Sequence, residues 1–204
     1  MLADFWFDPS CPYSWITAQW LREVVTVRPV ELRWHLMSLS VLNEGREDDP
    51  EGDPEGYLWL PVRICAAVEQ EYGQDALVRF YTALAARVHA PAPEWGPDLF
   101  HSALAEAGLP EKPAEAARST AYDEVIRASH AEGVGLVGDH VGTPIVAVTA
   151  PDGGRIAFFG PVISRVPRGE QAGRLWDGTL LVAGTPGFHE IKGPPADPDP
   201  FRST

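Results

Sequence analysis

Apolar side chains recur with two spacings near the start of this 204-residue chain, and each spacing predicts a different element. Residues 4–7 are aromatic-rich and are followed by the turn sequence DPS, which predicts a short strand. Over residues 12–27 apolar positions return every three or four residues, which predicts a helix with Ser10 or Cys11 as its N-cap. Apolar and polar residues alternate over residues 32–36, so a second strand follows. Such a strand–helix–strand unit predicts parallel strands and a right-handed crossover.

The middle of the chain shows helical spacing only. Residues 43–56 are acidic and rich in glycine and proline, which predicts a long solvated connection. Four helical segments follow, with stops expected at Gly108 and Gly133. Their apolar positions lie within residues 61–72, 77–88, 99–104 and 122–129.

The strand pattern returns at residues 144–149 and, after a PDGG turn, at 156–159, which predicts an antiparallel hairpin. A last helix is expected over residues 167–182, and the tail GPPADPDPFRST is expected to be disordered. This order predicts an α/β, thioredoxin-like fold with an inserted helical domain. The expected division is a discontinuous thioredoxin-like domain, residues 1–42 plus 135–204, and an inserted helical domain with an acidic connecting loop, residues 43–134.

Charge and composition narrow the class of protein. The formal net charge of −13 argues against a nucleic-acid partner, because polyanion binding depends on clustered Lys and Arg, although a local basic patch around Arg165 and Arg168 stays open. No apolar run approaches the ~20 residues that span a bilayer, and the N-terminus lacks the features of a signal peptide. We therefore expect a cytoplasmic protein with no membrane partner. Two cysteines are too few for a disulfide scaffold.

Cys11 lies where the first predicted helix begins, and this position predicts a reactive thiol. The unpaired N–H groups of a first helical turn and the helix dipole favour a thiolate, so we expect a lowered pKa for Cys11. The hydroxyl of Ser14, one turn along, can donate a hydrogen bond to the sulfur. Ser14 cannot attack a mixed disulfide, which excludes an internal dithiol cycle within the motif. The site then needs a small thiol, either to resolve a mixed disulfide or to carry the reactive sulfur itself.

A second signal is the segment Gly142-Thr143-Pro144, which immediately precedes a predicted strand. A cis proline there would turn the backbone N–H and C=O of Thr143 outward, where they could pair with a peptide-like ligand. An ordinary trans proline opening an edge strand is the alternative, and only the joint occurrence with Cys11 favours the first interpretation.

Cys65 could in principle resolve a mixed disulfide at Cys11. It shares an apolar helical stripe with Ile64 and Val68, however, and buried cysteines are usually packing residues, so we interpret Cys65 as part of the core. The histidines show no ligand spacing with one another or with the cysteines, so no metal site is expected.

These residues resemble a known family. The motif Cys11-Pro12-Tyr13-Ser14 on a strand-to-helix turn, with Thr143-Pro144 before a later strand, resembles the thioredoxin superfamily, and the helical insertion resembles its DsbA-like branch. FWFDPSCPYSWITAQWL, HLMSLSVLNEGRED, VGTPIVAV and FFGPVISRVPRGEQAGRLWDG are similar to segments of the mycothiol-dependent nitroreductase family of actinobacteria. Members of that family carry Cys-Pro-Trp-Cys or a one-cysteine version, and this chain departs from the two-cysteine form at Tyr13 and Ser14.

The resemblance implies a cytoplasmic reductase that uses mycothiol, or another low-molecular-weight thiol, as co-substrate, with Cys11 as nucleophile and Ser14 beside it. It further implies an electrophilic or disulfide substrate, and it leaves a homodimer open. The residues implied in binding the thiol are Pro12, Tyr13, Trp15, Asn43, His89, Thr143 and Pro144. For His89 a second interpretation is a cation at a helix end.

Two alternatives remain at this point. One is an enzyme similar to the kappa-class glutathione transferases and the hydroxychromene-carboxylate isomerases, which hold a cofactor thiolate with a hydroxyl where this chain has Cys11. The other is a non-catalytic module that binds a thiol or a peptide, in which the pKa of Cys11 would be ordinary.

Overall fold

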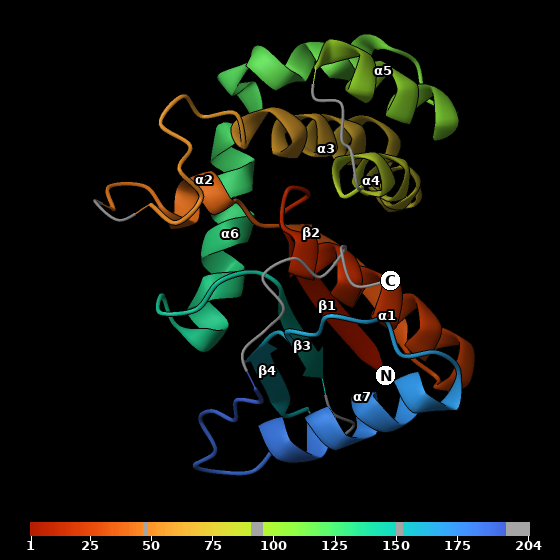
Figure 1. Cartoon of the computed structure of the whole chain (residues 1–204), viewed down its shortest axis with the longest axis vertical. Helices are drawn as coiled ribbons and strands as arrows, with labels where there is room; N and C mark the ends of the chain where they lie inside the picture. The colour runs from red at the N-terminus through yellow and green to blue at the C-terminus, as the bar shows by residue number, and fades with distance from the viewer. Residues whose placement is uncertain (47–48, 91–95, 150–152, 195–204) are drawn as a thin grey trace.

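The fold is described from a computed structural model, which covers residues 1–46, 49–90, 96–149 and 153–194. Figure 1 shows a sheet flanked by helices, with a helical block above one end of the strands. The elements in chain order are β1 (Leu2–Phe7), α1 (Pro12–Val27), β2 (Glu31–Leu36), α2 (Leu39–Leu42), α3 (Trp59–Tyr72), α4 (Gln74–Val88), α5 (Pro97–Glu106), the 3₁₀ helices η1 (Lys112–Arg118) and η2 (Thr120–Tyr122), α6 (Asp123–Val137), β3 (Ile145–Thr149), β4 (Arg155–Phe159) and α7 (Glu170–Ala183).

The four strands form one sheet in the order β2-β1-β3-β4. β1 runs parallel to β2 and antiparallel to β3, and β3 runs antiparallel to β4. The expected strand–helix–strand unit and the expected hairpin are therefore both confirmed. The fold is the α/β, thioredoxin-like fold that the element order predicts.

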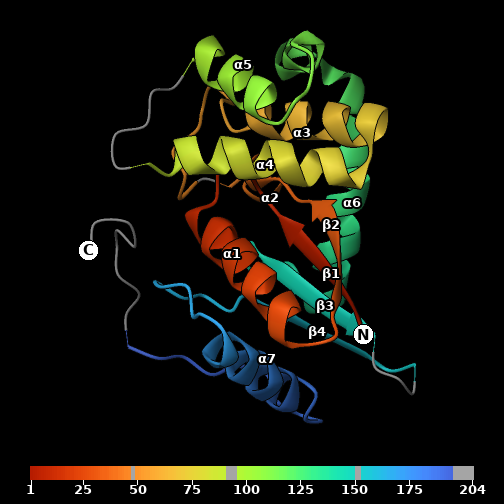
Figure 2. The same ribbon diagram turned by 90° about the vertical axis from the view of Figure 1, so that its right-hand side faces the viewer.

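The two faces of the sheet are covered by different helices (Figures 1 and 2). Because side chains alternate along a strand, Phe5 and Phe7 point to one face and Trp6 to the other. The Phe5 face packs with residues of α1 and α7, including Trp20 and Trp176, whose ring centroids lie 5.9 Å apart. The Trp6 face packs beneath the C-terminal half of α6.

The predicted helix stop at Gly133 is wrong, because α6 continues past Gly133 and ends at Val137. Gly133 lies against the indole of Trp6, and a Cβ at this position would meet the Trp6 ring at 2.8 Å. The glycine is therefore needed for a close approach between helix and sheet, not as a helix stop. The predicted domain division, between residues 134 and 135, falls inside this helix, and the division stays a prediction.

The helical insertion covers the outer edge of β2. The side chain of Gln74 accepts a hydrogen bond from the N–H of Trp34 at 3.0 Å and donates one to its C=O at 2.8 Å. The hydroxyl of Ser129 donates to the C=O of Leu36 at 2.7 Å. These contacts satisfy backbone groups that an edge strand otherwise leaves unpaired, and they hold the insertion against the sheet.

The remaining differences from the sequence predictions concern α2, the start of α7 and two segments outside the described residues. The helix α2 was not predicted; Ser38 caps it by accepting a hydrogen bond from the N–H of Val41. The last helix begins at Glu170, three residues later than expected. Part of the predicted PDGG turn and residues 195–204 of the predicted disordered tail lie outside the described residues.

Candidate active site around Cys11

The turn between β1 and α1 places Cys11 at the N-cap of α1. Its backbone is extended, with φ −79° and ψ 118°, and Pro12 occupies the first helical position, where its missing N–H costs nothing. The N–H of Cys11 donates to the C=O of Asp8 at 3.1 Å, which closes the turn. The predicted position of Cys11 is confirmed.

The sulfur of Cys11 lies between two chain segments. Its S–H donates to the C=O of Thr143 at 3.4 Å, and the backbone N–H of Ser14 donates to the sulfur at 3.4 Å. The hydroxyls of Ser14 and Thr143 are hydrogen-bonded at 2.9 Å. The Thr143–Pro144 bond is cis, as one of the two interpretations predicted. In this state the C=O of Thr143 is occupied by Cys11 itself.

The expected low pKa of Cys11 is wrong for this structure. Burial raises the pKa of the Cys11 thiol to about 11, although the backbone N–H and the side chain of Ser14 lower it. The helix N-terminus does favour the thiolate, but the side chain is only 5% exposed and a buried charge loses its hydration. Cys11 is therefore a protonated thiol at neutral pH in this conformation.

Asp8 is a buried carboxyl group that the sequence reading missed. Its two oxygens accept hydrogen bonds from the N–H groups of Ser10 at 2.6 Å and Leu39 at 2.7 Å, and its own N–H donates to the hydroxyl of Thr143 at 3.3 Å. Burial raises the pKa of Asp8 to about 7, against the lowering by these backbone hydrogen bonds. Asp8 thus links the Cys11 turn to α2 and to the cis-proline segment.

Two predicted binding residues, Asn43 and His89, come from the helical insertion and its entry. Asn43 ends α2, is 8% exposed, and neither its amide nitrogen nor its amide oxygen has a hydrogen-bond partner among the described residues. His89 ends α4, and its Nε2 lies 3.2 Å from the C=O of Pro9, two residues before Cys11. Burial lowers the pKa of His89 to about 4, which argues against a cation at this helix end.

The remaining predicted residues surround the motif. Tyr13 and Trp15 are half-buried in the first turns of α1, and the N–H of Trp15 donates to the C=O of Cys11 at 3.1 Å. The ring of Trp15 meets the ring of Tyr81 edge-on at 5.9 Å. Sequence reading also missed Tyr81, which it assigned only to an apolar helical stripe.

A signal for Asp8 was present in the sequence, since a carboxyl group three residues before a helix-capping cysteine can approach the same turn. No comparable signal existed for Tyr81, because its place depends on how α4 packs against β1.

Cys65 lies in the middle of α3 and is fully buried, as the core interpretation predicted. Burial raises the pKa of its thiol well above the ordinary value. Both cysteines are free thiols.

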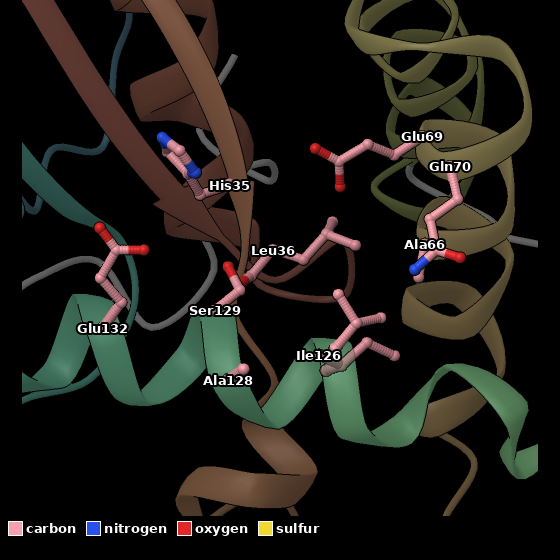
Figure 3. A pocket seen from close by; sticks show the side chains of 10 residues that line it. His35, Leu36, Ala66, Glu69, Gln70, Ile126, Ala128, Ser129 and Glu132 are labelled. Atoms are coloured by element: carbon pink, nitrogen blue, oxygen red, sulfur yellow. The ribbon is translucent and has the colours of Figure 1, made fainter.

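A cavity of about 420 Å³ opens elsewhere, between β2, α3 and α6 (Figure 3). None of the predicted site residues lines it. Polar side chains in its wall already serve the fold: Ser129 holds the C=O of Leu36, while His35 stacks on Trp6 at 4.6 Å and lies 2.9 Å from a carboxylate oxygen of Asp4.

The described part of the chain contains neither a candidate metal cluster nor a helix suited to cross a membrane. Within residues 1–46, 49–90, 96–149 and 153–194, no group of three or more His, Cys, Asp or Glu side chains is placed to hold a metal ion, and the expected absence of a metal stays a prediction. Over the same ranges no helix combines the length and apolar character needed to cross a membrane.

A cysteine at the start of α1, facing a cis proline before β3, together with helices inserted after β2, defines the DsbA-like branch of the thioredoxin fold. The chain is similar in structure to the cytosolic disulfide reductase DsbM from Pseudomonas aeruginosa, with a TM-score of 0.53 and 20% identity over 89% of this chain and 99% of that chain. A structure of DsbM with GSH gives a TM-score of 0.51 at 19% identity over 89% and 100% of the two chains. The structure of a 2-hydroxychromene-2-carboxylate isomerase gives 0.50 at 17% identity over 89% and 94%.

The sequence identifies the family within this class. The family model described as Rv2466c-like, mycothiol-dependent nitroreductase Rv2466c, matches residues 10–193. The chain belongs to this family and is a thiol oxidoreductase. The uncharacterized protein Rv2286c of Mycobacterium tuberculosis (strain ATCC 25618 / H37Rv) is 30% identical over 201 residues, which cover 95% of this chain and 83% of that protein.

Proposed function

We propose that this chain is a monothiol reductase, in which Cys11 forms a mixed disulfide with a low-molecular-weight thiol, and that this thiol is mycothiol. The observation that carries the proposal is the setting of the Cys11 sulfur, between the Ser14 N–H at the start of α1 and the cis-proline segment, with a hydroxyl at position 14. Membership of a family described as mycothiol-dependent makes mycothiol the first thiol to test.

The proposed cycle has two balanced exchange steps. In the first, the Cys11 thiolate attacks a disulfide, one sulfur stays on Cys11 as a mixed disulfide, and the other leaves as a thiolate. In the second, the thiolate of a mycothiol molecule attacks the sulfur bound to Cys11, forms a new disulfide with it and releases Cys11 as a thiolate. Where the entering disulfide joins mycothiol to the substrate and Cys11 takes the mycothiol half, the products are the free substrate thiol and mycothiol disulfide. Because Ser14 offers no second sulfur, the resolving thiol has to come from solution.

Several predicted residues have roles in this proposal. Asn43 offers a buried amide whose hydrogen-bonding groups are unused among the described residues, which suits the polar part of a bound thiol. Pro12, Tyr13, Trp15 and His89 surround the turn, and Thr143-Pro144 supplies the backbone edge. A cycle of this kind depends on a reducing pool of small thiols, which supports a cytoplasmic location.

The proposal is tested by weighing the intact protein after incubation with oxidised mycothiol. The expected result is one mycothiol adduct on the natural chain, released by reduced mycothiol, and none on C11S. If neither mycothiol nor glutathione adds to Cys11, and C11S turns over substrate like the natural chain, the proposal is wrong.

One observation favours a second candidate, an isomerase-like enzyme that holds a cofactor thiolate. The thiol of Cys11 is protonated and donates a hydrogen bond, which is the role that a hydroxyl has in such a site. A thiol-supplemented assay separates the two candidates: this second one predicts isomerisation without net electron transfer and retained activity in C11S, whereas the monothiol cycle predicts loss of activity in C11S.

A further inference from the structure

Tyr81 carries a hydroxyl for which the resting structure shows no use. The side chain lies on α4 and is fully buried, yet its hydroxyl has no hydrogen-bond partner among the described residues. Buried hydroxyls are nearly always paired, because an unpaired one loses its bond to water without replacement. We therefore expect the Tyr81 hydroxyl to form a hydrogen bond in another state of the site.

The ring of Tyr81 is packed by the residues on either side of Cys11. Its centroid lies 4.1 Å from that of Phe7, four residues before Cys11, and 5.9 Å from that of Trp15, four residues after it. Burial raises the pKa of Tyr81, and a thiolate at Cys11, followed by one at Cys65 and by the Asp8 carboxylate, raises it further. The ring of Tyr81 is therefore packed beside the turn that carries Cys11.

We propose that Tyr81 is a catalytic residue, whose hydroxyl donates a hydrogen bond to the Cys11 sulfur when that sulfur is a thiolate. This inference rests on the proposed function only in taking Cys11 as the reacting group. In the resolving step, the incoming thiolate forms a new S–S bond, the bond between the two sulfurs of the mixed disulfide breaks, and the electron pair stays on Cys11. The Tyr81 O–H then donates to this new anion.

The loss of the proton explains why a new donor is needed. As a thiol, Cys11 donates to the C=O of Thr143; as a thiolate it has nothing to donate, and the carbonyl oxygen repels it. The N–H and the side chain of Ser14 lower the pKa of Cys11, but burial outweighs both, so a further donor would favour the thiolate. Burial, followed by the charge of Cys11, raises the pKa of Tyr81 well above its ordinary value, so the hydroxyl stays protonated and donates a hydrogen bond without transferring its proton.

The test is Y81F, which removes the hydroxyl and keeps the ring. The rate of Cys11 alkylation by iodoacetamide is measured between pH 7 and 9, where it follows the fraction of thiolate, and the melting temperature is measured in parallel. Y122F is the matched control, since the hydroxyl of Tyr122 donates to Glu71 on an exposed surface.

The expected result is an alkylation rate about ten-fold lower in Y81F at each pH, because a hydrogen bond to a charged group is lost. Its melting temperature stays equal or rises, because the hydroxyl has no partner in the resting fold, and Y122F keeps the natural rate. An unchanged rate in Y81F overturns the proposal. A lower melting temperature also overturns it, because the hydroxyl would then serve the fold.

Alkylation needs no mycothiol, so the two proposals can fail separately. A mycothiol adduct together with an unchanged Y81F rate leaves the proposed function standing without Tyr81. A lowered Y81F rate without any thiol adduct leaves Tyr81 as the donor and removes the proposed function.

Discussion

The two cysteines of this chain share burial and differ in almost everything else. Burial raises the pKa of both thiols, and the charge of Asp8 adds to the rise in each. The sulfur of Cys11 at the N-cap of α1 is hydrogen-bonded to Ser14 and Thr143, whereas the side chain of Cys65 in α3 is fully buried in the hydrophobic core. Burial alone therefore does not distinguish a reacting thiol from a packing one. The distinction lies in the donors and acceptors placed around the sulfur.

The largest expected effect comes from replacing each of the two cysteines separately and comparing the two variants. C11S should abolish thiol-dependent turnover, about a thousand-fold loss or more, because a hydroxyl forms no mixed disulfide. C65A should keep turnover within about two-fold and lower the free energy of unfolding by about 1–2 kcal/mol, because a small cavity replaces the sulfur. Steady-state rates and urea unfolding of both variants check this. Turnover lost in C65A would contradict the distinction between the two cysteines.

The second effect concerns Asp8, whose negative charge raises the pKa of both cysteines. The pKa of Asp8 is about 7 in the folded state and near 3.8 when unfolded, so the folded state binds the extra proton. Its contribution to stability is present below about pH 4 and is lost as the pH rises through 7, in total about 4 kcal/mol. D8N should lack this dependence.

Urea unfolding at pH 5 and pH 8 measures the effect of D8N, with D98N on the exposed start of α5 as control. The lowered pKa of His89 makes the protein less stable as the pH falls below about 6.5, which opposes the effect of Asp8. Because His89 is present in every variant, the difference in unfolding free energy between D8N and the natural chain isolates Asp8. Cys11 alkylation at pH 8 should also be faster in D8N. An unfolding free energy with the same pH dependence in D8N and the natural chain would show that Asp8 is ionised throughout.

A smaller effect is expected from S14C, which adds a thiol one turn beyond Cys11. The new thiol can displace the small thiol from a mixed disulfide, so the lifetime of the adduct should fall by about a hundred-fold. Intact mass against time checks this, with S14C/C65A as control. If the adduct on the natural chain is equally short-lived, Cys65 reaches Cys11 after all.

Local patterns were enough to predict much of this molecule. The DPS turn and the helical spacing after Pro12 predicted a helix with Ser10 or Cys11 as its N-cap, because both depend on neighbours in the sequence. Cys65 was placed in the core by the same reasoning. The cis proline was favoured only by the joint occurrence of Cys11 and Thr143-Pro144.

What the sequence could not show depends on distant packing. The raised pKa of Cys11 follows from burial, which the helix position alone does not indicate. Gly133 is typical of a helix stop in the sequence, but its role depends on Trp6, a distant residue that lies against it. The ring of Tyr81 lies against Phe7 because α4 packs across the end of β1, and the apolar spacing of α4 did not indicate that contact.

The comparison between the two cysteines is tested most directly by alkylating the native protein at several pH values and mapping the labelled peptides. We expect the labelling rate of Cys11 to rise with pH, about ten-fold per unit from pH 7 to 9, while Cys65 stays unlabelled until the protein unfolds. A Cys11 rate that is already constant at pH 7, or labelling of Cys65 at a similar rate, would contradict it.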